Sequence, residues 1–287
     1  SSSSSSSSAP PRDPNRPVAN FHTVTTGEEV YMCVRGRGNI EKFNDENETP
    51  LISAIKKGNR DVVTALLAHG ANPNNSHPAA MRPIHWAALR GEAKMIEELV
   101  KKGANVNDLS REGTPLTIAA TQGHVEAVKT LLRFKANTET KDKEEWTPLM
   151  RASAEGHIDV VDLLLISRAK IDAQSPSQDS PLSLASKAGH LEIMNMLASQ
   201  GADLDHRDSL GWTILMRAVA NGDSIVASRL TNLGCDVNLQ RKDGRTALMM
   251  AAEANETDIV HILLSRGADS QLVGKKGRKA IDLTQSQ

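Results

Sequence analysis

One sequence unit returns along most of this chain of 287 residues, at an interval of 32 or 33 residues. We number the units by an anchor position, which is proline in the first five: Pro50, Pro83, Pro115, Pro148, Pro181, Ile214, Ala247 and Ala280. Leucine or isoleucine follows every anchor, and alanine stands four positions after it in all seven complete units. A period in this range is typical of proteins that stack small structural units, each burying its apolar face against the next.

Each unit is predicted to contain two short helices. Threonine before the anchor can cap the first helix, and proline suits the first helical position because its missing N–H would have no partner there. A left-handed residue then ends this helix, at Gly58, Gly91, Gly123, Gly156, Gly189, Gly222 and Asn255. A second apolar stripe with helical spacing follows, and it has leucine 16 positions after the anchor in every complete unit: Leu66, Leu99, Leu131, Leu164, Leu197, Leu230 and Leu263.

Two stretches show the unit most fully. They are Arg-Pro-Ile-His-Trp-Ala-Ala at 82–88 and Gly-Ala-Asn-Val-Asn at 103–107. These motifs resemble the ankyrin repeat, whose signature is Thr-Pro-Leu-His-x-Ala. The resemblance covers about 46–283 and comprises seven full repeats and a truncated eighth. It implies an all-α fold, namely a solenoid of antiparallel helix pairs with β-hairpin fingers projecting to one side.

The chain is expected to divide into three segments. Residues 1–20 begin with eight serines and continue with a proline-rich tract, which has too little apolar surface to offset the entropy of ordering, so we expect disorder there. Residues 21–45 are expected to cap the first repeat, and the apolar residues from 24 to 43 predict a short pair of amphipathic helices. Residues 46–287 are expected to form the repeat domain.

The composition excludes several classes of function. Only seven residues are aromatic, so the core must be thin and aliphatic. The net charge of −1 and the scattered aromatic residues disfavour a nucleic-acid partner, because such binding needs basic surfaces or stacking platforms. No apolar run of 18 residues could span a membrane, and Cys33 and Cys235 do not resemble a disulfide framework. We therefore expect a cytoplasmic protein.

No catalytic residue, metal site or cofactor is predicted. His124, His157 and His190 occupy one slot in successive units, where stacking would hold them about 10 Å apart, too far to share a metal ion. The resemblance implies that a histidine in this slot hydrogen-bonds within the loop. Cys235 stands where other units have alanine, which indicates a small buried side chain. The chain also lacks phosphate-loop, serine-hydrolase, zinc-protease and kinase signatures.

Two units depart from the pattern where the second helix ends. Lys135 and Arg168 stand where five other units have glycine. A left-handed residue other than glycine costs on the order of 1 kcal/mol. We expect a tolerated, slightly strained turn at both places, with an altered loop as the alternative.

The resemblance implies that a partner binds to the finger loops and to the concave surface of the first helices. The residues expected to bind it are Trp86, Arg90, Trp146, Arg151, Trp212, Arg217 and Arg245. Tryptophan and arginine are the residues most enriched at binding hot spots. Tryptophan two positions before the anchor is also a common brace between fingers in this family, so Trp146 and Trp212 have that alternative role.

The first finger is acidic and the last fingers are basic, which would orient a partner or simply provide a solvated end to the rod. From these features we expect a non-catalytic scaffold or adaptor that binds a protein partner in a cytosolic or cytoskeletal assembly. The alternative is a targeting or regulatory domain of a larger enzyme, or an intracellular effector.

Overall fold

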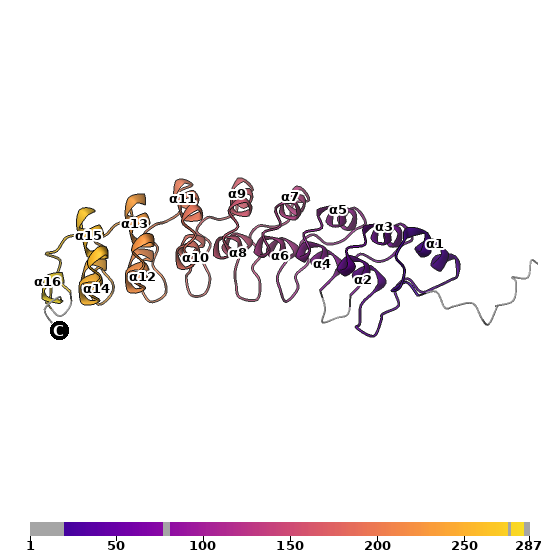
Figure 1. The fold of residues 1–287 in the computed structure, drawn as a ribbon, viewed down its shortest axis with the longest axis horizontal. Coiled ribbons are helices and arrows are strands. Elements are labelled where there is room, and N and C mark those ends of the chain that lie inside the picture. The colour runs from indigo at the N-terminus through magenta and orange to yellow at the C-terminus, as the bar shows by residue number, and fades with distance from the viewer. Residues whose placement is uncertain (1–19, 77–80, 275–276, 284–287) are drawn as a thin grey trace, which may run out of the picture.

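The computed structural model describes residues 20–76, 81–274 and 277–283. The expected disorder of residues 1–20 therefore concerns a segment that, except for Asn20, lies outside the described residues. Within the described residues the chain forms helix pairs stacked into an elongated, gently bent rod (Figure 1). The all-α solenoid of antiparallel helix pairs expected from the repeat pattern is thus confirmed.

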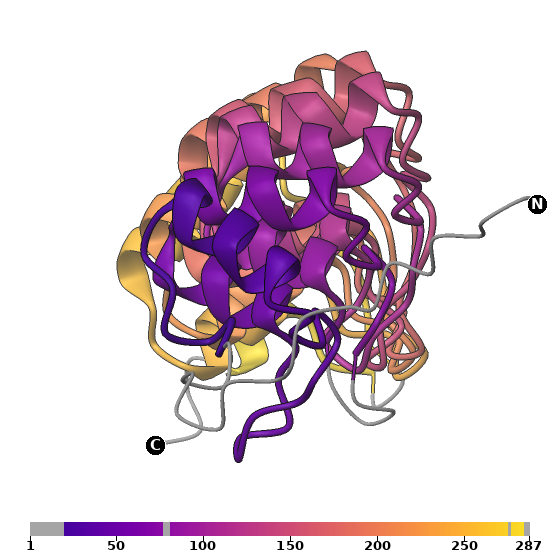
Figure 2. The same cartoon turned by 90° about the vertical axis from the view of Figure 1, so that its right-hand side faces the viewer.

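The helices form two layers along the rod, with the second helices in the upper layer of Figure 1 and the first helices in the lower layer. The first helices are α2 (Pro50–Lys57), α4 (Pro83–Leu89), α6 (Pro115–Thr121), α8 (Pro148–Glu155), α10 (Pro181–Ala188), α12 (Ile214–Ala220), α14 (Ala247–Glu253) and α16 (Ala280–Leu283). The second helices are α3 (Arg60–Ala68), α5 (Ala93–Lys101), α7 (Val125–Arg133), α9 (Ile158–Ile166), α11 (Leu191–Ser199), α13 (Ser224–Leu233) and α15 (Thr257–Ser265). Figure 2 shows the finger loops gathered along one side of the rod.

Hydroxyl side chains begin the first helices, as the sequence predicts. Thr49, Thr114, Thr147, Ser180, Thr213 and Thr246 each accept a hydrogen bond from the backbone N–H three positions later. Arg82 replaces the hydroxyl residue in repeat 2, and there the backbone N–H of Arg82 donates to Nδ1 of His85 at 3.2 Å. His85 therefore fixes the start of α4 in place of threonine.

The core is aliphatic and continuous along the rod. The leucines 16 positions after the anchors are fully buried in all seven complete repeats, and the alanines four positions after the anchors are buried as well. Small alanine side chains allow neighbouring first helices to approach closely, while leucine fills the space between helix pairs. This packing explains how the chain buries a core with so few aromatic residues.

A ladder of side-chain hydrogen bonds joins each repeat to the next in the loops that follow the second helices. Its acceptors stand 24 positions after the anchor and are Asn74, Asn107, Glu139, Asp172, Asp205 and Asn238. Each accepts from a backbone N–H of the following repeat, as Asn74 does from Asn105 at 3.1 Å. Glu41 makes the same contact with the N–H of Asn72, so the ladder begins before repeat 1.

The segment before repeat 1 contains one helix, which corrects the predicted pair. Helix α1 (Gly27–Arg35) packs on α3 as a second helix would, with Val30 fully buried. Arg37 has φ +58°, the left-handed value found where second helices end, and the chain then turns toward the first finger. The apolar residues Ile40 and Phe43 fall in this turn, which holds Gly36 and Gly38, so they form no helix.

The turns at Lys135 and Arg168 keep the common geometry. Their φ angles are +61° and +63°, and the next backbone N–H donates to the carbonyl oxygen five residues earlier, as it does after Gly103. The altered loop is therefore not observed, and the strained but tolerated turn is confirmed.

The fingers are shorter than β-hairpins. The described residues contain only two isolated bridges, Ser110 with Gly113 and Arg207 with Thr213. Several fingers are closed by two backbone bonds at the tip, as in the N–H of Asp208 donating to the carbonyl oxygen of Trp212 at 3.0 Å and the N–H of Gly211 donating to that of Asp208 at 2.8 Å.

Candidate functional site

All three tryptophans lie on the first-helix and finger side of the rod, and each ring carries a cation. The ammonium group of Lys56 lies 4.7 Å from the Trp86 ring centroid, and the guanidinium of Arg151 lies 4.6 Å from that of Trp146. Two guanidinium groups, from Arg217 and Arg241, lie 4.7 and 4.4 Å from the Trp212 centroid. Such contacts hold a ring in one orientation and contribute about 0.5–1 kcal/mol each at exposed sites.

Arg151 is held by its own finger. Its Nε donates to Oδ2 of Asp142 at 2.7 Å, and its Nη2 pairs with Glu144. Burial alone would lower the pKa of Arg151, but the hydrogen bonds that it donates to these two carboxylates raise its pKa. The side chain is only 18% exposed, so Arg151 belongs to a group of ring, cation and carboxylates and is not a free charge.

Arg217 repeats this arrangement in repeat 6. Its guanidinium pairs with Asp208, whose Oδ1 also accepts from the backbone N–H groups of Leu210 and Trp212 at 2.9 and 3.0 Å. Burial works against ionisation of Asp208, but these hydrogen bonds and Arg217 outweigh it and lower the pKa of Asp208. Asp208 therefore holds both the backbone of the finger and the guanidinium group of Arg217 in place.

The other two predicted arginines have different surroundings. Arg90 extends back over Gly58 of repeat 1 and lies 3.8 Å from Glu92, so it is not in the Trp86 contact. Arg245 pairs with Glu253 at 2.9 Å. The structure thus brings Trp146 together with Arg151, and Trp212 together with Arg217, but it leaves Arg90 and Arg245 in separate groups.

The sequence analysis missed the carboxylates that neutralise the groove cations. An aspartate six positions before the anchor pairs with an arginine three positions after it in repeats 4 and 6. A second pattern joins the residue two positions before the anchor with the residue six after it, in Glu48 with Lys56, Asp179 with Lys187, and Arg245 with Glu253. Both spacings are visible in the sequence as charges of opposite sign on one repeat.

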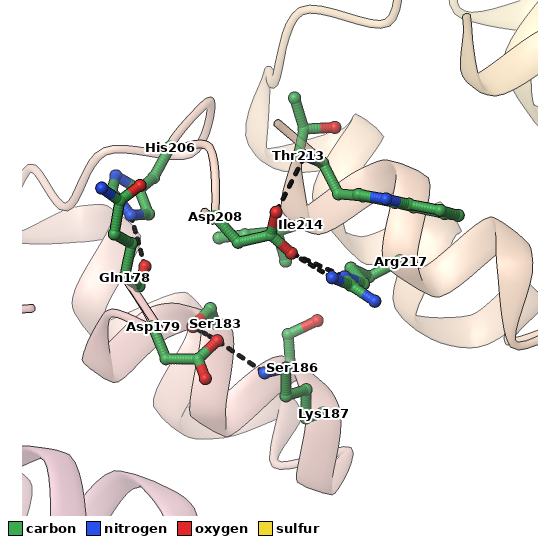
Figure 3. Close-up of a pocket in the computed structure, with 11 residues that line it drawn as sticks. Gln178, Asp179, Ser183, Ser186, Lys187, His206, Asp208, Thr213, Ile214 and Arg217 are labelled. Carbon is green, nitrogen blue, oxygen red and sulfur yellow. Dashed lines mark hydrogen bonds and ion pairs between the residues drawn. The ribbon is translucent and has the colours of Figure 1, made fainter. Parts of the chain in front are cut away.

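A small notch of about 20 Å³ lies on the groove side between repeats 5 and 6 (Figure 3). The ion pair of Asp179 with Lys187 forms one wall, and Asp208 with Arg217 forms the other. His206 closes one side and donates to the carbonyl oxygen of Gln178 at 2.6 Å. Each wall is already neutral, and the notch has room for no more than about one water molecule.

The recurring histidines join neighbouring repeats, which corrects the expectation of bonds within their own loop. Nε2 of His124 donates to the carbonyl oxygen of Leu89 at 2.9 Å, and His157 contacts Thr121 in the same way. His190 reaches Ala154 at 3.1 Å. The part of the chain that the structure describes has no group of three or more histidine, cysteine, aspartate or glutamate residues placed to hold a metal ion.

Cys235 lies in the core, as its alanine-like position predicts. Burial raises the pKa of its thiol to about 12. The thiol is therefore protonated at neutral pH and is not a nucleophile. Among the described residues, no helix is long and apolar enough to cross a membrane.

The family comparison agrees with the repeat pattern. A family model described as ankyrin repeats in three copies matches residues 24–110, 84–175 and 182–273. The human ankyrin repeat and SOCS box protein 11 is 29% identical over 96 residues, which are 33% of this chain and 30% of that protein. The Drosophila melanogaster ARF GTPase-activating protein Git is 33% identical over 99 residues, which are 34% of this chain and 14% of that protein. The chain therefore spans less than a third of the length of these relatives.

Solved structures show the same architecture. The ankyrin repeat domain of human ASB11 superposes with a TM-score of 0.61 at 29% identity and covers 72% of this chain and 93% of that domain. The ankyrin repeat domain of Bcl-3 has a TM-score of 0.69 and covers 72% of this chain and 95% of its own. At 24% identity the second likeness supports the fold alone.

Proposed function

This chain belongs to the ankyrin-repeat family, and from that premise we propose that it is a non-catalytic scaffold or adaptor that binds a protein partner through its concave face and fingers. Ankyrin repeat domains are generally non-catalytic binding modules. The proposed contact residues are Trp86, Arg90, Trp146, Arg151, Trp212, Arg217 and Arg245.

The tryptophans carry this proposal. Cations fix all three rings, and among the described residues none of the three indole N–H groups has a hydrogen-bond partner. None of these nitrogens is among the buried unsatisfied atoms, so solvent reaches them. An amphipathic ring that is already ordered and has a free donor loses little entropy on binding, which is why tryptophan is favoured at interfaces.

The test compares two double variants in a capture experiment. Trp86→Ala with Trp146→Ala changes the groove, while Ile166→Ser with Ile225→Ser changes two isoleucines of the second helices that are 71% and 65% exposed. We expect the groove variant to lose proteins that the wild-type chain retains from a lysate, and the second-helix variant to retain them. Equal retention by both variants, with unchanged circular dichroism, would reject the concave face as the binding surface.

The second candidate function is a targeting or regulatory domain of a larger enzyme or an effector. It is favoured by the likeness to Git, whose name describes a GTPase-activating protein of which the matched segment is 14%. An antibody against the repeat domain would detect a native protein much larger than this chain if that function is correct.

We also propose a cytoplasmic setting within a larger cytosolic or cytoskeletal assembly, because two unpaired thiols suit a reducing compartment. Imaging of the tagged native protein tests this setting.

A further inference from the structure

The last three fingers form the most basic surface of the described chain. We define the basic finger patch as Arg207, Arg241, Lys242, Arg245, Arg278 and Lys279. Residues 206–213, 239–246 and 277–279 contain these six cations and only two carboxylates, Asp208 and Asp243. The first finger has the opposite balance, with Glu41, Asp45, Glu46 and Glu48 against Lys42 between 40 and 49.

Within the described part of the chain, four of the six cations in the patch have no carboxylate partner. Among the described residues, Arg207, Lys242, Arg278 and Lys279 have no carboxylate partner within ion-pair distance. Lys242 and Arg278 are exposed. Arg241 and Arg245 share Asp243, and Arg245 also pairs with Glu253. The carboxylates of the chain therefore leave most of this positive charge unneutralised.

Bonds between fingers hold the patch in register. The Nη1 of Arg207 donates to the carbonyl oxygen of Gln240 at 2.7 Å, and the side-chain amide of Gln240 donates to that of Val273 at 3.2 Å. Arg241 of the seventh finger lies over the ring of Trp212, which precedes α12. Because these contacts link three successive fingers, their cations repeat at the spacing of the stacked helices, about 8–10 Å.

This spacing fits an extended polypeptide. A segment in the polyproline II conformation rises about 3.1 Å per residue with three residues per turn, so every third side chain points the same way and lies about 9 Å further along, close to one finger. We propose that the basic finger patch binds an extended acidic segment of the partner protein, with a carboxylate at every third residue facing successive fingers. This inference rests on the proposed function, since it names the class of partner for the C-terminal part of the same surface.

Nucleic acid fits the same surface less well. Two guanidinium groups already lie over the Trp212 ring, so that ring offers no open platform for a base. The excess of positive charge is confined to three fingers, whereas the whole chain carries a net charge of −1. A short row of carboxylates matches this limited patch better than a long polyanion does.

The test is a titration with purified components. The probe is a fluorescent peptide with glutamate at every third position and serine or alanine elsewhere, and its isomer has the same glutamates in one block. The patch variant is Lys242→Glu with Arg278→Glu, two exposed side chains without an ion-pair partner among the described residues. The control variant, Lys94→Glu with Lys102→Glu, makes the same charge change on exposed positions at α5.

We expect fluorescence anisotropy at low salt to show binding of the spaced peptide that is about tenfold weaker in the patch variant and within about twofold of wild type in the control. The block isomer should bind more weakly than the spaced peptide. Equal losses in the two variants, equal binding of the two isomers, or tighter binding of an oligothymidylate of equal charge would each overturn the proposal. None of these results depends on Trp86 or Trp146, so the capture experiment remains a separate test of the proposed function.

Discussion

The guanidinium group of Arg241 lies 4.4 Å from the ring centroid of Trp212, although the two residues belong to the fingers of different repeats. Arg217 contacts the same ring from the repeat of Trp212 itself. Trp212 therefore braces the sixth finger against the seventh, whereas Trp146 contacts an arginine of its own repeat. The bracing role that the sequence left open for both residues is thus seen across repeats at Trp212.

Replacing Arg241 by alanine should loosen these two fingers. We expect a loss of about 0.5–2 kcal/mol of local stability, because the cation over the ring is removed. In a chain with Trp86→Phe and Trp146→Phe, fluorescence reports on Trp212 alone, and acrylamide should quench it more strongly after the Arg241→Ala change. Arg241→Lys keeps the charge and is the control. Equal quenching in the Arg241→Ala variant and in the chain that keeps Arg241 would show that Arg241 does not order the ring of Trp212.

Replacing Gly123 should destabilise the protein for two separate reasons. Its φ of +72° disfavours a side chain, and a Cβ there would lie 2.5 Å from Nδ1 of His157. Gly201 has φ +88° but nothing within 4 Å of the same position, so it isolates the backbone effect. Gly201→Ala should cost about 1–2 kcal/mol in urea unfolding. Gly123→Ala should cost about 1–3 kcal/mol more, because the imidazole must move. Equal costs would mean that the histidine shifts freely.

Truncation of Leu131 should be strongly destabilising. The side chain is fully buried in the core of repeat 3, so Leu131→Ala leaves a cavity and should cost about 2–5 kcal/mol. Ile166→Ala, at a residue that is 71% exposed, is the matched control and should change stability by less than about 0.5 kcal/mol. Urea unfolding followed by circular dichroism measures both, and similar values would contradict the assigned core.

His85 should make the stability of repeat 2 depend on pH. Burial lowers the pKa of His85, although its hydrogen bond to the carbonyl oxygen of Asp108 opposes the shift. The unfolded chain therefore binds a proton at the ordinary histidine pKa of about 6.5, while His85 in the folded chain binds one only at a lower pH. The contribution of neutral His85 is fully present above that pH and is lost as the pH falls below it.

The measurement for His85 is the urea midpoint between about pH 7.5 and about pH 5.5. We expect the midpoint of the wild-type chain to fall over this range, and the fall to be smaller in His85→Gln. An unchanged slope in the variant would show that His85 does not produce the pH dependence.

The fold could be predicted closely from the sequence, because each repeat contains the same local signals for its helices and turns. The threonine caps, the left-handed residues and the leucine stripe all occupy their expected places. The segment before repeat 1 was harder to predict, because it contains one helix where a complete repeat has two, and no helix precedes α1 among the described residues. A pattern that is repeated seven times is far easier to recognise than the single copy that departs from it.

The positions of the candidate-site residues could be predicted from the sequence, but the side chains that they interact with could not. The sequence placed Trp146, Arg151, Trp212 and Arg217 on one side of the rod, yet the carboxylates that bind these arginines were not anticipated. Asp142 and Asp208 stand nine positions before their arginines and meet them only because the finger folds back over the first helix. The contact of Arg241 with Trp212 crosses repeats, so it depends on stacking distance rather than on any local spacing.

The contact between glycine and histidine in successive repeats bears on how such a chain can evolve. The imidazoles of His124, His157 and His190 occupy the space that a side chain would need at Gly91, Gly123 and Gly156 of the repeats before them. A duplicated or transposed repeat that carries this histidine therefore fits only behind a repeat whose first helix ends in glycine. Six of the seven complete repeats have this glycine and repeat 7 has Asn255 instead, so a repeat with this histidine fits behind any of the first six and would need a paired substitution only behind the seventh.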